Sequence, residues 1–345
     1  MERRAFIAGV TATACVLAAP GRSAAAPRME LEPVLIEVPG AENMQFFNLW
    51  VALGAGYFEL EGLAPRIVVA KGPRTTGDLL LNGRADVALL PPPMFLGMMA
   101  EDKPIVLFAS LLANEPINLI VRKEIAEARR LSEQQTLAAR LQAMKGLRVG
   151  LAGEVSPRLK TLAARAGLDA EKDFRLAVVP GPDQVEAFAG GKVDALFAHT
   201  PYLETALVEH GAVLVAETSS GAVPELADGQ IHALATTRRT AQAKSGLIEA
   251  ITLAIAQAQQ LIHTDLKATV DAVIASGAAG SDRRLIETIA AVYAPAVPRT
   301  PEISIEGILR DASLYPAHPR APDFTMVDAA RFVAPEFAAQ ALRPR

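Results

Sequence analysis

Two helix starts in the middle part of the chain carry residues that could hold an electron-rich group. Ser156-Pro157 and Thr200-Pro201 each have a hydroxyl residue suited to capping a helix, followed by Pro at the first helical position. The unpaired N–H groups and the positive dipole end of such a start suit a carboxylate, a sulfonate or a similar group. Ordinary caps have the same pattern, so a binding role depends on where the fold places these starts.

The chain lacks the sequence patterns of the common enzyme classes. The five histidines are not at metal-ligand spacing, and no GxSxG, GxGxxG, P-loop or paired-histidine motif is present. His199 is the histidine of interest, because it follows a predicted strand; support of the neighbouring cap is the alternative interpretation. We therefore predict a protein that is not an enzyme and uses no metal or cofactor.

The first 25 residues have the layout of an export signal. Arg3 and Arg4 precede an apolar stretch at residues 5–19 and small residues at 23–26. The stretch is shorter than the ~20 residues that span a bilayer, and the arginine pair resembles a twin-arginine signal. We predict cleavage near Ala25 and export to the periplasm. Cys15, the only cysteine, is interpreted as an apolar residue of the signal, with a lipid anchor as the alternative.

Composition excludes some partners. The 345 residues suffice for two domains, and half of them are hydrophobic. The 34 basic and 38 acidic residues give a mildly acidic chain without basic runs interleaved with aromatic residues, so we expect no nucleic-acid partner.

Short apolar strands alternate with helices twice along the chain. This alternation predicts parallel sheets covered on both faces. From about residue 240 the pattern becomes helical, and apolar residues at 248, 251, 255, 258 and 262 form one stripe. The expected strands are residues 34–38, 66–70, 87–90, 105–111, 147–151, 174–179 and 195–197, and the expected helices are 44–58, 75–82, 94–100, 156–166, 183–189, 265–275, 284–293 and 303–315.

One motif occurs twice. Residues 81–93 (LNGRADVALLPPP) and 189–201 (AGGKVDALFAHTP) share a Gly, a basic residue, an Asp, an apolar run and a Pro seven positions after the Asp. We interpret both as a helix, a glycine turn and a strand, with Asp86 and Asp194 tying the turn by backbone hydrogen bonds. Ligands should then bind after each strand, at the carboxyl end of the sheet.

These motifs also carry a family resemblance. Residues 48–63 (NLWVALGAGYFELEGL) and 79–91 resemble an N-terminal signature, and residues 145–153 and 190–202 resemble its second-domain pieces. Over roughly residues 35–237 the chain resembles periplasmic solute-binding proteins of ABC transporters, in the nitrate/sulfonate/taurine and thiamine-pyrimidine-precursor (NMT1/THI5-like) group. The resemblance is specific for the group and does not identify the ligand.

The resemblance implies a type II periplasmic-binding-protein fold, an α/β fold of two lobes joined by two crossing strands. The lobes would close on a small-molecule solute, and the closed monomer would dock on an ABC permease in the inner membrane. We expect crossings near residues 114–121 and 217–236. Domain I would comprise residues 28–115 and 231–345, domain II residues 116–230, and residues 124–144 would form a solvated helix pair.

In this architecture the ligand contacts come from loops between a strand and the next helix. Several acidic residues in these loops disfavour a small oxyanion, because a buried carboxylate facing an anion is costly. We therefore expect a neutral, zwitterionic or nitrogen-bearing organic solute. A sensor adaptor for a membrane receptor, or a lyase or synthase of this fold, is the alternative. The candidate ligand-binding residues are Asn43, Gln45, Phe46, Pro92, Met94, Glu115, Glu154, Ser156, His199, Thr200 and Tyr202, with Glu42, Arg74 and Arg158 nearby.

Overall fold

The computed structural model describes residues 31–40, 43–72, 75–153, 156–278, 280–315 and 323–344. The chain divides into two units, Met1–Glu30 and Leu31–Arg345, and the structure described below is that of the second unit. The predicted export signal, its cleavage site and Cys15 lie outside the described residues, as do Glu42, Arg74 and Glu154.

The first lobe is built on a five-stranded sheet in the order β2-β1-β3-β10-β4. Strand β1 pairs in parallel with β2 and β3, whereas β10 is antiparallel to β3 and β4. The sheet thus takes its fourth strand from a distant part of the chain. Its strands are β1 (Glu32–Val38), β2 (Leu63–Val69), β3 (Val87–Leu90), β4 (Ile105–Leu112) and β10 (His232–Thr237).

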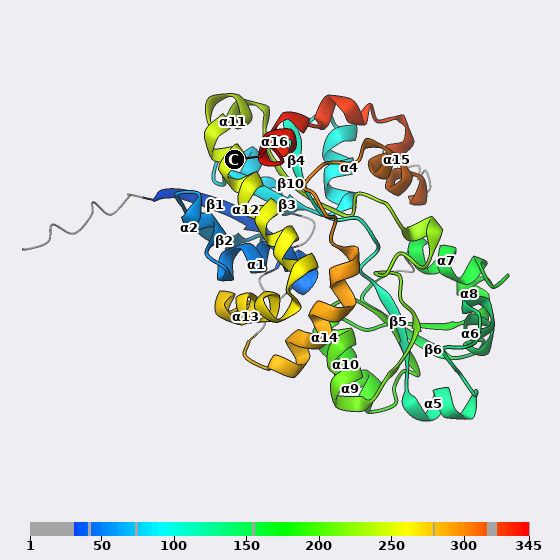
Figure 1. The fold of residues 1–345 in the computed structure, drawn as a ribbon. Helices are drawn as coiled ribbons and strands as arrows, with labels where there is room; N and C mark the ends of the chain where they lie inside the picture. Colours follow the sequence, from blue (N-terminus) through cyan, green and yellow to red (C-terminus); the bar gives the residue numbers. More distant parts are fainter. Residues whose placement is uncertain are drawn as a thin grey trace, which may run out of the picture. The chain divides into compact units, whose positions relative to one another are not determined.

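The second lobe repeats this plan in the order β7-β6-β8-β5-β9. Here β6 pairs in parallel with β7 and β8, and β5 is antiparallel to β8 and β9. Figure 1 shows β5 and β6 in a part of the molecule separate from β1 to β4. The strands are β5 (Asn118–Val121), β6 (Arg148–Leu151), β7 (Arg175–Val178), β8 (Ala195–Ala198) and β9 (Val213–Ala216). The predicted pair of α/β lobes is confirmed.

The C-terminal helices belong to the first lobe. The predicted stripe on α12 is buried from Ile248 to Ile262 and packs in the core with β1 and α1. In Figure 1 the long helix α12 runs across this lobe beside α16. The helices of this part are α11 (Arg238–Ala243), α12 (Ser245–Thr264), α13 (Leu266–Ser276), α14 (Arg283–Tyr293), η5 (Ala294–Ala296), α15 (Ile305–Leu314), η6 (Phe324–Met326), η7 (Ala329–Phe332) and α16 (Pro335–Ala341).

The single helix expected at residues 44–58 is wrong. The segment forms three short helices, and Gly56 between the last two has φ +73°, a left-handed conformation that interrupts an α-helix. The N-terminal helices of the first lobe are η1 (Met44–Phe46), α1 (Phe47–Gly54), α2 (Tyr57–Leu60), α3 (Asp78–Leu81) and α4 (Pro92–Ala100).

The helices of the second lobe surround its own apolar core. The segment at residues 124–144 forms two short helices, as predicted. The helices are α5 (Lys123–Ala128), α6 (Leu137–Ala143), α7 (Pro157–Ala164), α8 (Ala170–Asp173), η3 (Gly181–Asp183), α9 (Gln184–Ala189), α10 (Tyr202–His210) and η4 (Pro224–Leu226). None of the helices in the described part of the chain is both long enough and apolar enough to cross a membrane.

The repeated motif adopts the same geometry in both lobes. Asp86 Oδ2 accepts the N–H of Leu35 in β1 at 3.1 Å, and Asp194 Oδ2 accepts the N–H of Arg148 in β6 at 2.9 Å. In turn, the N–H of Asp86 donates to the carbonyl oxygen of Leu35 at 3.0 Å, and the N–H of Asp194 donates to that of Arg148 at 2.8 Å. Both aspartates are structural, as predicted, but these bonds hold the motif to the neighbouring strand, where the prediction was that they would hold the turn.

Candidate ligand-binding site

A pocket of about 380 Å³ lies where loops of the two lobes meet. The first lobe contributes residues that follow β1 and end β2, and the second lobe contributes the loop between β8 and α10. This is the carboxyl end of both sheets, where open α/β folds bind ligands. The lining residues are Gly40, Asn43, Val69, His199, Thr200, Pro201 and Tyr202. Four of the candidate residues therefore line one pocket.

His199 and Tyr202 form the aromatic part of the pocket. Their ring centroids are 5.4 Å apart, and the rings are tilted by 57°. Gly181 packs against the tyrosine, since a Cβ at this glycine would come within 2.6 Å of the ring. This close contact with Gly181 restrains the position of the Tyr202 ring.

The imidazole of His199 is a neutral group in this pocket. Its Nδ1 lies 2.7 Å from the carbonyl oxygen of Thr200, so Nδ1 donates and Nε2 carries the lone pair. Burial lowers the pKa of His199, and the hydrogen bond to the carbonyl opposes this only in part. The ring is therefore a hydrogen-bond acceptor for a ligand with an N–H or O–H group.

The expected capping role of Thr200 is wrong. Helix α10 begins at Tyr202 with Pro201 as its N-cap, and no side chain caps it. The Thr200–Pro201 peptide bond is cis, and the N–H of Thr200 donates to the Tyr293 hydroxyl at 2.9 Å. The N–H of Leu203 is directed to the His199 carbonyl at 3.4 Å. Because the N–H groups of Thr200 and Leu203 are bonded within the protein, this helix start offers an anion fewer donors than its sequence predicts.

The candidates in η1 divide between the pocket and the core. The Asn43 side chain caps η1 by accepting the N–H of Gln45 at 2.9 Å, and its carbonyl accepts the Trp50 indole N–H at 3.1 Å. Gln45 and Phe46 are buried in the first lobe instead. Gln45 Oε1 lies 2.9 Å from Nε2 of His232, and the Phe46 ring meets the same imidazole edge-on. Burial lowers the pKa of His232 to about 3, so it is neutral.

Glu115 does not face a ligand as an unpaired carboxylate. It is only 2% exposed and forms an ion pair with Nε of Arg158, a residue placed outside the site by sequence reasoning. Burial raises the pKa of Glu115, whereas the guanidinium opposes that shift. Ser156 caps α7 as predicted, because its hydroxyl accepts the Arg158 N–H at 3.2 Å. The carboxylate of Glu115 is thus paired within the protein, and its role as a ligand contact stays a prediction.

The candidates after β3 lie away from the pocket. Pro92 is buried in the first turn of α4, and Met94 packs against the apolar core of the first lobe with Phe95 and Leu96. The three consecutive prolines at residues 91–93 leave the start of this helix without N–H groups for a ligand. Glu154 stays a prediction, because it lies outside the described residues.

Sequence reasoning missed the residues that connect the lobes. Tyr293, the last residue of α14, donates its hydroxyl proton to the Pro116 carbonyl at 2.6 Å and accepts the N–H of Thr200. Tyr315, at the end of α15, accepts a hydrogen bond from Nη1 of Arg158 at 2.8 Å. A tyrosine at the end of each predicted helix was the only sequence signal for these contacts.

Two other buried carboxyl groups lie near these connections. Burial raises the pKa of Glu204 in α10 to about 7 and that of Asp311 in α15 to about 7. Asp311 accepts the N–H of Gln230 at 2.9 Å. Among the described residues, no three His, Cys, Asp or Glu side chains come together as metal ligands would.

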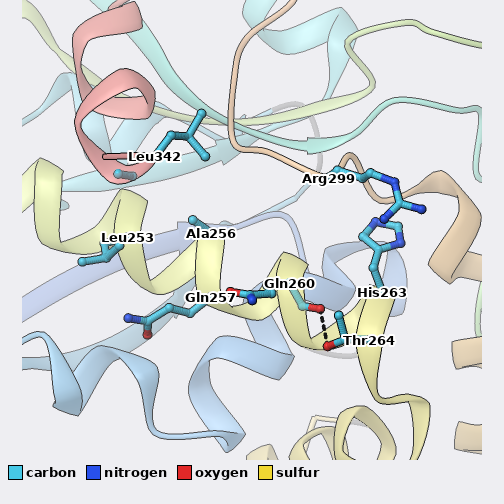
Figure 2. Close-up of a pocket in the computed structure, with 9 residues that line it drawn as sticks. Leu253, Ala256, Gln257, Gln260, His263, Thr264, Arg299 and Leu342 are labelled. Atoms are coloured by element: carbon cyan, nitrogen blue, oxygen red, sulfur yellow. Dashed lines mark hydrogen bonds between the residues drawn. The ribbon is translucent and has the colours of Figure 1, made fainter. Parts of the chain in front are cut away.

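A second pocket, of about 340 Å³, lies on the first lobe along α12 (Figure 2). Gln260, His263 and Thr264 line it from the helix, with Arg299 and Leu342 from later segments. All of these residues belong to the first lobe. The pocket therefore does not share the position between lobes that makes the first one a candidate site.

Comparison with known proteins identifies the fold. The sequence model of the NMT1-like family matches residues 41–276. The structure is similar to the alkanesulfonate-binding protein SsuA from Xanthomonas axonopodis pv. citri bound to MOPS, with 19% identity, a TM-score of 0.62, and coverage of 88% of this chain and 99% of that one. It is also similar to the periplasmic nitrate-binding protein NrtA from Synechocystis PCC 6803, with 14% identity, a TM-score of 0.61, and coverage of 91% and 90%. The predicted periplasmic-binding-protein fold is thus confirmed.

Not every protein of this architecture is a binding protein. The desulfurization enzyme DSZB has a TM-score of 0.56 with this chain at 15% identity, over 90% of this chain and 99% of that one. No curated protein sequence gives a significant match. The fold therefore does not decide between binding and catalysis, and the function has to be inferred from the residues of the pocket.

Proposed function

The chain belongs to the NMT1-like family, and from this premise we propose that it is an extracytoplasmic solute-binding protein that delivers a small organic molecule to an ABC importer. The observation that carries the proposal is the pocket between the lobes, lined by Asn43 from one lobe and by residues 199–202 from the other. Residues from both lobes would enclose a solute when the lobes close. We also propose that the boundaries between the lobes lie at residues 115–116 and 230–231.

The pocket favours a neutral or nitrogen-bearing solute. Among the described residues, the seven that line the pocket include no Asp, Glu, Lys or Arg, and His199 is neutral with Nε2 as an acceptor. The ring of Tyr202 offers an apolar face beside it. A ring N–H or an amine donor would match these groups, whereas a small oxyanion would need several convergent donors.

Weak oxyanion binding is expected for the same reason. The amides of Thr200 and Leu203 are already bonded within the protein, and Pro201 has none. We therefore propose that nitrate, sulfate and simple alkanesulfonates bind poorly. Glu154 would add an acceptor for a cationic group if it faces the same space.

Native mass spectrometry of the protein purified from periplasm tests the proposal. We expect a bound organic molecule that dissociates on unfolding and that carries no net negative charge. Isothermal titration with the identified solute, nitrate and a simple alkanesulfonate then ranks the affinities. A tightly bound oxyanion would contradict the proposed solute class, and chemical turnover of the bound molecule would favour the enzyme alternative.

The delivery step requires its own experiment. The solute-loaded protein should bind membranes that contain its cognate permease and stimulate ATP hydrolysis there. Stimulation of a receptor kinase in place of an ATPase would favour the sensor alternative.

A further inference from the structure

Two tyrosines of the first lobe reach the helix starts of the second. Tyr293 is the last residue of α14, and Tyr315 follows the last residue of α15. The hydroxyl of Tyr293 bonds to Thr200, just before α10, and the hydroxyl of Tyr315 bonds to Arg158, the second residue of α7. Both helices of the second lobe that border the candidate loops are therefore held by a tyrosine of the first.

The rings stay with the first lobe while the hydroxyl groups contact the second. Tyr293 is fully buried and belongs to the core that includes α12 and α13. Tyr315 packs against the core of α4 and α15, with the ring of Phe324 edge-on at 5.9 Å. Because each ring is fixed in one lobe, separation of the lobes must break the hydrogen bond between its hydroxyl and the helix start of the other lobe.

Both contacts converge on the segment that crosses between the lobes. Tyr293 donates to the carbonyl of Pro116 at 2.6 Å. Arg158, the partner of Tyr315, forms its ion pair with Glu115, the preceding residue. These two residues lie between β4 of the first sheet and β5 of the second. The two tyrosines therefore join each helix start to the point about which the lobes would rotate.

Neither tyrosine lines the candidate pocket, whose residues are given above. Tyr293 is bonded to one lining residue, because its hydroxyl accepts the N–H of Thr200. Burial raises the pKa of Tyr293 well above its usual value, so its hydroxyl keeps the proton that it donates. Both residues would thus act on solute binding through contacts within the protein and not by touching the solute.

We propose that Tyr293 and Tyr315 are a pair of interlobe clasps that set the ratio of closed to open molecules, and through it the affinity for solute. They are positioning residues. The inference rests on the proposed function only in that the lobes separate to admit a solute. Removal of one buried hydroxyl should raise the open-to-closed ratio roughly tenfold, the usual size for one hydrogen bond.

Distances between spin labels test the clasps without a ligand. Labels are placed at Lys267 in the first lobe, whose side chain is 82% exposed, and at Val178 in the second, which is 67% exposed. The full chain carries Cys15→Ser, which removes its only native cysteine. We expect Tyr293→Phe and Tyr315→Phe each to add a population at longer distance, and the double variant to add more. Tyr57→Phe, in α2, is the matched control and should match the parent.

Amide exchange at Thr200 provides a second measurement. Tyr293→Phe should speed exchange at Thr200, whereas Tyr315→Phe should do so only in proportion to its effect on opening. Distance distributions that superimpose on the parent in both Phe variants, at unchanged melting temperature, would overturn the proposal. Failure to find a solute by mass spectrometry would contradict the proposed function and leave these distances unaffected.

Discussion

The two lobes contain the same motif, and aligning its hydrogen bonds shows where they differ. Leu35 and Arg148 hold equivalent positions, because the N–H of each donates to the aspartate carboxylate of its lobe and the carbonyl of each accepts the N–H of that aspartate. Counting from these pairs, Glu37 corresponds to Gly150 and Met94 to Tyr202. The strand and turn are preserved, whereas the residues that follow them are not. We call the shared turn and strand, with its aspartate, the frame. The side chains that could serve a function are those that follow the frame in each lobe.

The loop after the third strand of each lobe shows this difference. In the first lobe it contains three prolines and directs Met94 into the core. In the second lobe the corresponding positions are His199 to Tyr202, which line the pocket. This loop of the second lobe thus supplies side chains that would recognise a solute, whereas the equivalent loop of the first lobe lies away from the pocket.

The largest expected effect tests whether the frame is equivalent in the two lobes. Asp86→Ala and Asp194→Ala each leave a strand N–H without its acceptor, so each should cost about 2 kcal/mol of unfolding free energy. The ion pairs with Lys244 and Arg148 involve exposed side chains and should add little. Urea unfolding of the two variants measures the costs. If one substitution cost more than twice as much unfolding free energy as the other, the two aspartates would not be equivalent.

The acid limb of the Asp194→Ala profile supplies a control. The hydrogen bond from Arg148 lowers the pKa of Asp194, so its contribution is present above the unfolded pKa of about 3.9 and is lost as the pH falls through the folded value. The cost of Asp194→Ala should therefore shrink below about pH 4. A cost that is constant with pH would mean that the carboxylate charge has no part in it.

The sequence predicted this frame because its signals are local. Gly, Asp and an apolar run within ten residues indicate a turn and a strand, and the structure confirms both copies. The contacts between lobes were not predictable in the same way. Arg158 and Tyr315 are 157 positions apart, and Thr200 and Tyr293 are 93 apart. Thr200 is an example of an error from this source. The local pattern predicted a helix cap with a free N–H, whereas the N–H of Thr200 donates to the distant Tyr293.

The second prediction compares the two loops. Tyr202→Ala should weaken binding of the solute identified by mass spectrometry about tenfold or more, because an aromatic wall of the pocket is lost. Met94→Ala, at the corresponding position of the first lobe, should change the affinity less than threefold while lowering stability as a core truncation does. Titration calorimetry and thermal melts separate the two effects. Equal losses of affinity would show that both loops contact the solute.

The third prediction concerns Gly150 of β6. A Cβ at this position would lie 2.9 Å from Cδ2 of Leu196 and 3.4 Å from Val193. Gly150→Ala should therefore cost about 1 kcal/mol, since overpacking is only partly offset by the lower entropy of the unfolded chain. Leu196→Val in the same background should recover part of the loss. A gain in stability from the single substitution would show that the side chains move aside freely.

The smallest expected effect lies at Glu37, where the first lobe has a buried carboxyl group in place of that glycine. Its Oε2 accepts the N–H of Leu80 in α3 at 3.2 Å, and burial raises its pKa despite backbone hydrogen bonds that lower it. A carboxyl group whose folded pKa is raised stabilises the fold below its unfolded pKa, and that stability is lost as the pH rises through the folded value.

Glu37→Gln keeps an acceptor and cannot ionise, so it should cost about 0.5–1 kcal/mol of unfolding free energy near pH 4 and less at pH 8. Urea unfolding at several pH values measures the difference, with Glu59→Gln on the exposed surface of α2 as the control. A cost that grows with pH would mean that the ionised carboxylate is the favoured partner of the α3 start, and that this lobe uses charge where the other uses only close packing.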